Sequence, residues 1–204
     1  PHSHFNMKKL LLLILLFSSA LFAQPNPQSK KVTEKFFSNP DVEINTPAFA
    51  KEKGFTNYEE LMAFIEEKVA DHPNLISYRF IGESQKGKKI PILTLNNSSR
   101  ANTKIRVWMQ GGLHGNEPAS TEGLLHLINQ LLEDPGHQNL LNNIDLRIVP
   151  MANIDGYIKQ DRYAANGLDL NRDQTKLMAP ESVILKEAFN KFNPEVAVRS
   201  EEHT

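Results

Sequence analysis

The sequence predicts an α/β domain in which helices flank a mixed, largely parallel sheet. Segments rich in β-forming residues alternate with helical segments along most of the chain, which is the order expected of a sheet covered by helices. The 204 residues are enough for one domain with a sizeable core. A content of 40% hydrophobic and 23% charged residues is typical of a globular protein.

The first expected elements are a helix and a β-hairpin. Thr56 and Glu59 match a capping box, and the apolar residues that follow them have helical spacing. This helix should end near His72, which precedes a proline. Two short strands at residues 77–81 and 89–95 flank a glycine-containing turn and should pair as a hairpin.

The remaining elements repeat the alternation of strand and helix. A strand is expected at residues 105–109, just before two glycines, and a helix should begin near Pro118. A strand at 146–149, a helix at 181–192 and a last strand at 195–198 follow. Because helical segments separate these strands, the sheet should be largely parallel or mixed.

The N-terminus has the order of a secretory signal peptide at residues 7–23. Met7 is followed by two lysines, an apolar run and small residues up to Ala23. Since the apolar run is shorter than the ~20 residues that span a bilayer, we expect cleavage near Ala23 and no stable membrane anchor afterwards. The protein should therefore be secreted or periplasmic. Residues 1–6 are expected to be non-native upstream sequence, and the polar, proline-containing residues 24–45 to be a linker or lead-in.

Charge and cysteine content exclude several classes of site. The net charge of -1 gives no case for binding nucleic acid or an anionic membrane surface. The absence of cysteine excludes disulfides, thiolate metal ligands and a cysteine nucleophile. A metal site would therefore use His, Asp or Glu side chains.

The first candidate site is Gly-Gly-Leu-His-Gly-Asn-Glu-Pro at residues 111–118. It falls where a strand passes into a helix, at the sheet edge where α/β proteins place their ligands. His114 and Glu117 can converge on one metal ion if the turn between them is tight, and the glycines permit such a turn. A His-Glu pair with a distant His is a catalytic zinc set. Alone the pair is a weak signal, because a surface His and a helix-start Glu produce the same pattern.

A second cluster makes the pattern specific. Asn-Ile-Asp-Gly-Tyr at residues 153–157 is followed by Arg162 and then by the pair Asn171-Arg172. With the preceding His-Glu pair, this order resembles the zinc metallocarboxypeptidases of the carboxypeptidase A type. The resemblance covers about residues 46–198, which would be the N-terminal part of the family's catalytic domain.

The resemblance implies a role for each residue. His114 and Glu117 would bind Zn2+. Asn171 and Arg172 would hold the terminal carboxylate of a peptide substrate. Arg162 would stabilise the oxyanion that forms when water attacks the scissile carbonyl. The implied reaction is the zinc-dependent hydrolysis of C-terminal residues from peptides that have a free C-terminal carboxylate.

Simpler roles stay open for some of these residues. The two arginines would serve only as salt-bridge partners if they paired with Asp161, Asp169 or Asp173. Asp155 and Gly156 are expected to shape a turn and not to contact substrate.

The chain departs from the family at its end. The family has Asp-x-His after the strand that ends here at Val198, and that His is its third zinc ligand, whereas Glu201 stands in its place here. In a divergent relative Glu201 could bind zinc, and His203, two residues on, would lie on the same side of a strand. Residues 199–204 match the translation of a widely used DNA sequencing adapter, however, so we expect them to be non-native and His203 not to be a ligand. The family's general base and a Tyr that covers the substrate belong to the following half of the domain. This fragment alone is therefore expected to be inactive.

Two other functions remain open. Zinc deacylases that cleave N-acyl amino acids share segments like those around the His-Glu and Asn-Arg pairs, although the segment at 153–157 favours a carboxypeptidase. A non-catalytic protein that binds peptide ends would account for Glu201 if that residue is native.

Overall fold

The computed structural model describes residues 31–32, 35, 42–97 and 103–201. The chain divides into two compact units, Pro1–Glu43 and Ile44–Thr204, and the second contains the sheet. The expected signal peptide, the upstream residues, most of the lead-in and His203 lie outside the described residues. Within the described part, no helix is both long and apolar enough to cross a membrane.

The second unit is built on a five-stranded mixed sheet. Its strands are β1 (Ile76–Glu83), β2 (Lys89–Leu95), β3 (Ile105–Gln110), β4 (Ile144–Val149) and β5 (Val196–Arg199), in the order β1-β2-β4-β3-β5. β1 pairs with β2, and β2 with β4, in antiparallel fashion. β3 is parallel to both β4 and β5. The mixed sheet is therefore confirmed, and its three parallel strands end at one edge, where such sheets bind ligands.

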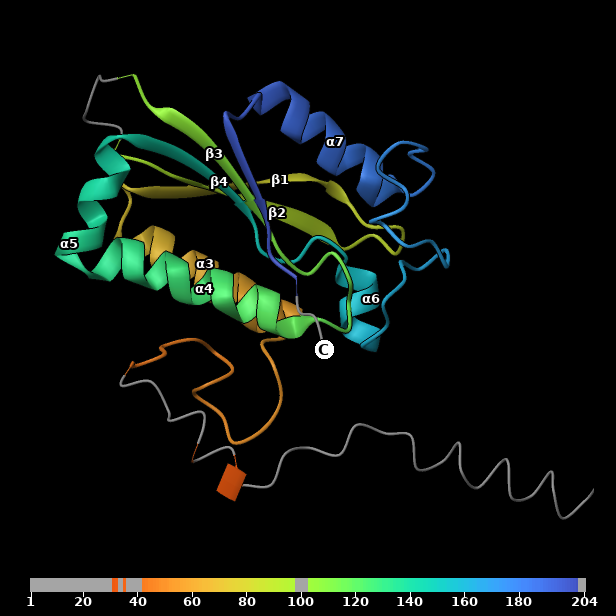
Figure 1. The fold of residues 1–204 in the computed structure, drawn as a ribbon, viewed down its shortest axis with the longest axis horizontal. Helices are drawn as coiled ribbons and strands as arrows, with labels where there is room; N and C mark the ends of the chain where they lie inside the picture. The colour runs from red at the N-terminus through yellow and green to blue at the C-terminus, as the bar shows by residue number, and fades with distance from the viewer. Residues whose placement is uncertain (1–30, 33–34, 36–41, 98–102, 202–204) are drawn as a thin grey trace, which may run out of the picture. The chain divides into compact units, whose positions relative to one another are not determined.

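Helices cover both faces of this sheet (Figure 1). The main helices are α3 (Tyr58–Asp71), α4 (Pro118–Glu133) and α7 (Pro180–Phe192), and the shorter ones are α5 (Pro135–Gln138), the 3-10 turn η1 (Asn139–Asn142) and α6 (Ile154–Lys159). α3 and α4 lie on one face, joined by a 2.8 Å ion pair between Lys68 and Glu133. α7 lies on the other, where Phe189 meets buried Trp108 edge to face, with ring centroids 5.5 Å apart.

The start of α3 differs by one residue from the expected capping box. Asn57, not Thr56, is the N-cap residue, and its side chain accepts a hydrogen bond from the Glu60 N–H while Glu60 accepts from the Asn57 N–H. Thr56 instead donates its N–H to the buried carboxylate of Glu122 on α4. A tertiary contact therefore decides between two adjacent residues that are both good N-caps. The predicted end of the helix near residue 72 is confirmed.

The segment around Asp155 is a helix where a turn was expected. Asn153 caps α6 by accepting the Gly156 N–H at 3.0 Å. The Asp155 side chain is buried and faces away from solvent, where its carboxylate accepts from the Ser84 hydroxyl and the Lys86 N–H. α6 is thereby fixed to the β1–β2 hairpin, which itself forms as predicted.

The loop before α7 is closed by Asp173. Its buried carboxylate accepts the N–H groups of Met178 and Ala179 at 2.9 and 2.8 Å. Burial by itself raises the pKa of the Asp173 carboxyl, but the hydrogen bonds from these two N–H groups, together with Ser182 and the charge of Lys176, outweigh burial, so the pKa is lowered. The folded state therefore favours the charged form of this side chain.

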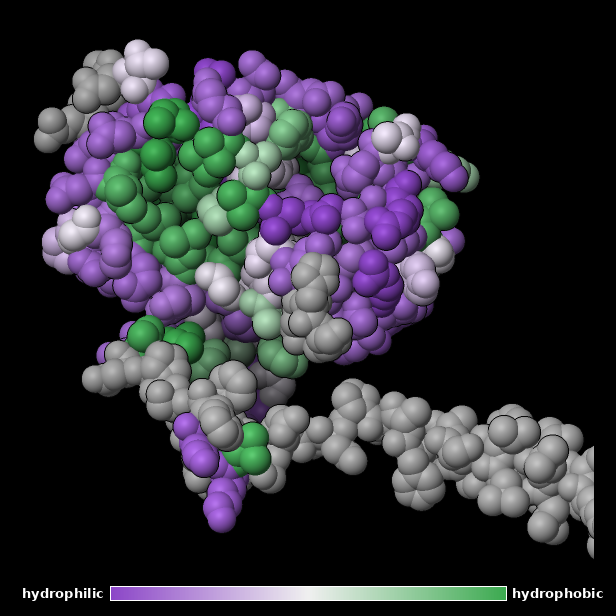
Figure 2. All heavy atoms as spheres, viewed as in Figure 1, coloured by the Kyte–Doolittle hydropathy of each residue, from purple (hydrophilic) through white to green (hydrophobic). Residues whose placement is uncertain are grey.

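One part of the sheet is less covered by helices. Figure 2 shows apolar side chains gathered near β3 and α4, and polar side chains near the end of the sheet beside α6. β5 is one of the two edge strands, and its Val196 and Val198 are 45% and 40% exposed. They pair in register with Val107 and Met109 of β3, so these four side chains share one face of the sheet.

Candidate zinc site

The candidate site begins in the loop between β3 and α4. Gly112 has φ of +60°, which lets the chain reverse directly after the strand. The N–H of Gly112 donates to the Ser120 hydroxyl at 2.8 Å, and this bond folds the loop back onto the first turn of α4. The loop thereby carries His114 and Glu117, only 2% and 8% exposed, to the carboxyl edge of the parallel strands.

His114 and Glu117 face one another as the spacing predicted. Nδ1 of His114 lies 2.8 Å from Oε1 of Glu117. Glu201, two residues beyond β5 in the segment that is expected to be non-native, lies beside them, with its Oε1 3.9 Å from the same imidazole nitrogen. One potential ligand atom from each of the three lies within 4.8 Å of the others. Zinc accepts imidazole nitrogen and carboxylate oxygen as ligands, so the chemistry and spacing of this set fit that metal.

Asp169 connects the His114–Glu117 pair to two of the three other predicted site residues, Arg162 and Asn171. Its Oδ1 lies 3.2 Å from Nε2 of His114 and accepts the Asn171 N–H at 2.8 Å. Its Oδ2 accepts from Nε of Arg162 at 3.2 Å. A carboxylate on the second nitrogen of a metal-binding His fixes the ring and its tautomer. Sequence reasoning treated Asp169 only as a salt-bridge partner and missed this bridging position.

The pKa of the Asp169 carboxyl reflects these contacts. Burial raises it, but the Asn171 N–H, the His114 ring and the charge of Arg162 together outweigh burial and lower it. Asp169 is therefore held as a carboxylate, the form that accepts hydrogen bonds from all three neighbours.

Arg162 contacts Glu117 as well as Asp169. Its Nη1 is 3.5 Å from Oε1 of Glu117. The salt bridge to Asp169, which the sequence left open as an alternative for this arginine, is present and lies inside the site. A guanidinium beside the metal ligands has N–H groups to offer to a developing negative charge.

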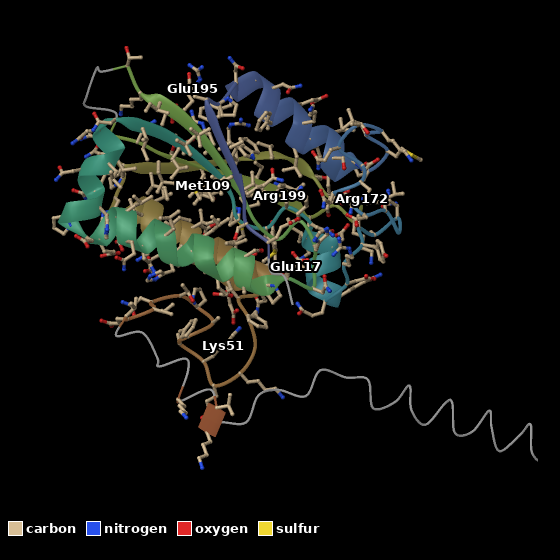
Figure 3. The ribbon with its side chains drawn as sticks, viewed as in Figure 1. Lys51, Met109, Glu117, Arg172, Glu195 and Arg199 are labelled. Atoms are coloured by element: carbon tan, nitrogen blue, oxygen red, sulfur yellow. The ribbon has the colours of Figure 1, made fainter. Side chains whose placement is uncertain are left out.

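The Asn171-Arg172 pair lies beside this cluster, and the two side chains differ in their contacts. Oδ1 of Asn171 accepts from Arg199 at 2.6 Å, and Arg199 also pairs with Glu201 at 3.0 Å. The Arg172 side chain is exposed and forms no salt bridge with a carboxylate of the described residues. Figure 3 shows Glu117, Arg172 and Arg199 at the same end of the sheet. Of the predicted residues, the structure thus joins four through Asp169 and leaves Arg172 separate.

Comparison with known proteins places this chain in a family. The family model for zinc carboxypeptidase matches residues 61–201. Carboxypeptidase 2 of Trichophyton rubrum is 33% identical over 178 residues, covering 79% of this chain and 33% of that protein. Carboxypeptidase A1 of Sus scrofa is 30% identical over 103 residues, covering 48% of this chain and 24% of that protein. The chain thus spans about a third or less of the length of these relatives.

Solved structures share the fold. The carboxypeptidase A of Helicoverpa armigera superposes with a TM-score of 0.67 at 22% identity, covering 85% of this chain and 52% of that one. A metallo-carboxypeptidase of Burkholderia cenocepacia superposes with a TM-score of 0.66, covering 72% of this chain and 41% of that one. The predicted fold class is confirmed by these matches. The chain belongs to the zinc carboxypeptidase family and covers part of that family's catalytic domain.

Proposed function

We propose that the full-length gene product is a zinc-dependent carboxypeptidase that removes the last residue from peptides with a free C-terminal carboxylate. The observation that carries the proposal is the convergence of the buried His114–Glu117 pair with Arg162 through one carboxylate, Asp169. A bound metal ion would polarise a peptide carbonyl, and a neighbouring cation would stabilise the oxyanion, so both features promote hydrolysis of a peptide bond.

His114 and Glu117 would hold the Zn2+, which when bound supplies Lewis acidity toward a carbonyl and acidifies a water. Asp169 keeps the His114 ring oriented by accepting from its second nitrogen. The same carboxylate fixes the Nε side of Arg162, and Nη1 lies 3.5 Å from Glu117, so the Nη side of the guanidinium faces the His114–Glu117 pair, where it would donate to the oxyanion of the scissile carbonyl.

Arg172 and Asn171 would recognise the end of the substrate. A guanidinium presents two parallel N–H donors, which match the two oxygens of a carboxylate. Since Arg172 is exposed and has no carboxylate partner among the described residues, its donors are available to a peptide. We further propose that the protein is exported and cleaved near Ala23, without a stable membrane anchor, because residues 7–23 have the order of a signal peptide.

Kinetics of arginine variants test this proposal in the full-length protein. Arg172→Ala should weaken turnover of free-carboxylate peptides far more than Arg172→Lys, although Lys also loses the bidentate geometry. Arg162→Ala should lower kcat by about 10²–10³, as loss of one oxyanion donor does. Zinc-dependent peptide hydrolysis that neither arginine substitution changes would contradict the proposal.

The 204-residue chain alone should not hydrolyse peptides. The resemblance assigns the general base to a part of the domain that this chain does not cover. The test is a direct assay of the chain beside the full-length product, and turnover by the chain alone would contradict this assignment.

A second candidate is a non-catalytic protein that binds peptide ends. It is favoured by the position of Glu201, a carboxylate where the family has its third His ligand. Sequencing the gene across residues 199–204 separates the two functions. An Asp-x-His after Val198 favours the enzyme, whereas a native Glu201, with peptide binding but no turnover, favours the binder. No contact specifically favours the N-acyl amino acid deacylase.

A further inference from the structure

The segment that carries Arg162 is packed directly on the loop at residues 111–117, which holds the proposed metal ligands His114 and Glu117 and is called the ligand loop below. Gly115, between the two proposed ligands, lies so close to α6 that an added Cβ would be 2.1 Å from the carbonyl carbon of Gly156 and 2.4 Å from the Asp161 oxygen. A Cβ added to Gly156 itself would lie 2.6 Å from the Tyr163 carbonyl oxygen. The ligand loop thus packs on α6 main chain to main chain, and the Asn153 side chain and the Tyr163 carbonyl lie against Gly156 on α6.

Asn153 lies at the centre of this stack and is fully buried. Its N–H donates to the Gly112 carbonyl at 2.8 Å, which ties it to the ligand loop. Its Oδ1 accepts the Gly156 N–H at 3.0 Å, and this bond fixes which end of the amide is oxygen. The Nδ2 group then points at the Arg162 carbonyl oxygen, 3.4 Å away.

Two hydrogen bonds therefore connect the main chain at residues 161–162 to α6 and to its N-cap residue. The Asp161 N–H donates to the Gly156 carbonyl at 2.9 Å, and the Asn153 amide reaches the carbonyl of the next residue, Arg162. The Arg162 side chain is held separately by Asp169. Asn153 thus links the two segments, since its main-chain N–H contacts the loop that carries the proposed metal ligands and its side-chain Nδ2 contacts the backbone of the arginine.

We propose that Asn153 is a positioning residue for Arg162, which fixes the distance between the Arg162 guanidinium and the proposed metal ligands. This inference rests on the proposed carboxypeptidase function, in which Arg162 stabilises the oxyanion. Asn153 has no contact with substrate in this role and acts only through Arg162. A displacement of about 1 Å in a catalytic group can cost about 10²-fold in rate, so loss of this link should be measurable.

The test is a double-mutant cycle in the full-length, zinc-loaded protein. Asn153→Ser keeps an N-cap oxygen for α6 but removes the Nδ2 donor. We expect kcat to fall about 10-fold or more with KM nearly unchanged, within the range known for residues that orient catalytic groups. In the Arg162→Ala background the same substitution should change kcat less than about 2-fold, because the group that it positions is gone. Asn166→Ser, at an exposed turn of the same segment where Asn166 accepts the Leu168 N–H, is the matched control and should leave kcat unchanged.

Two outcomes would overturn the inference. An equal loss of kcat in both backgrounds would assign Asn153 a purely structural role, and so would an unchanged kcat in Asn153→Ser. If Asn153→Ser does not fold, Asn153→Asp provides the same cycle, since it keeps the cap and the shape and replaces only the donor. Absence of any peptidase activity in the parent protein would instead refute the proposed function, so the two failures are distinguishable.

Discussion

Replacing Gly115 with alanine should destabilise the protein, because the new methyl group would meet three main-chain atoms. The nearest is the Gly156 carbonyl carbon at 2.1 Å, followed by the Tyr157 nitrogen at 2.3 Å and the Asp161 oxygen at 2.4 Å. Ordinary contact begins at 3.4 Å, so α6 and the ligand loop would have to separate by about 1.3 Å. Overpacking of a core costs about 1–3 kcal/mol, and we expect about 3 kcal/mol here since backbone cannot move aside like a side chain.

Gly123→Ala is the matched control for this experiment. Gly123 lies inside α4, and an added Cβ there has nothing within 4 Å. Alanine in a helix interior is about 0.5–1 kcal/mol more favourable than glycine, so this variant should be more stable than the parent. Urea unfolding of the full-length protein followed by circular dichroism gives both free energies of unfolding. Equal stability of Gly115→Ala and the parent would refute the stacking of α6 on the ligand loop.

Three further predictions concern other parts of the molecule. Because the folded state lowers the pKa of Asp173, this side chain should contribute its full stabilisation above the ordinary Asp pKa of about 4 and lose it as the pH falls through the lower folded value. Asp173→Asn should therefore weaken the fall of the melting temperature at acid pH in thermal unfolding, and an unchanged fall would contradict the assignment. Asp169→Asn should weaken zinc binding about 10–100-fold in equilibrium dialysis, since the His114 ring loses its carboxylate partner; undiminished affinity would exclude the orienting role. Expression from Met7 in a bacterial host should deliver a periplasmic or secreted protein that begins near Gln24, and N-terminal sequencing that finds Met7 on a soluble cytoplasmic product would count against export.

Most secondary structure could be predicted from the sequence because local signals and burial agree. The helix at Pro118 begins at the predicted residue, where Pro suits the first turn and the apolar spacing follows directly. The cap of α3 was misplaced by one residue, because Thr56 and Asn57 each have a Glu three positions later, and in the fold Thr56 is bonded to the distant Glu122 instead. α6 was missed because its six residues are too few for a helical period to be recognised.

The candidate site was predictable in its residue types but not in its connections. The spacing of His114 and Glu117 within a glycine-containing turn is local, so their convergence could be anticipated. Asp169 can bridge His114 and Arg162 only because the chain after Arg162 folds back toward them, and no local sequence pattern predicts this change of direction. The same holds for Asn153, whose side-chain amide contacts a residue nine positions further along the chain.

The most direct test of the carboxypeptidase proposal is a pair of peptides that differ only at the C-terminus. One carries a free carboxylate and the other an amide, and release of the last residue by the full-length, zinc-loaded protein is measured for both. If Arg172 recognises the terminal carboxylate, only the free-ended peptide should be processed, because an amide cannot pair with both guanidinium donors. Equal release from both peptides would contradict a carboxypeptidase.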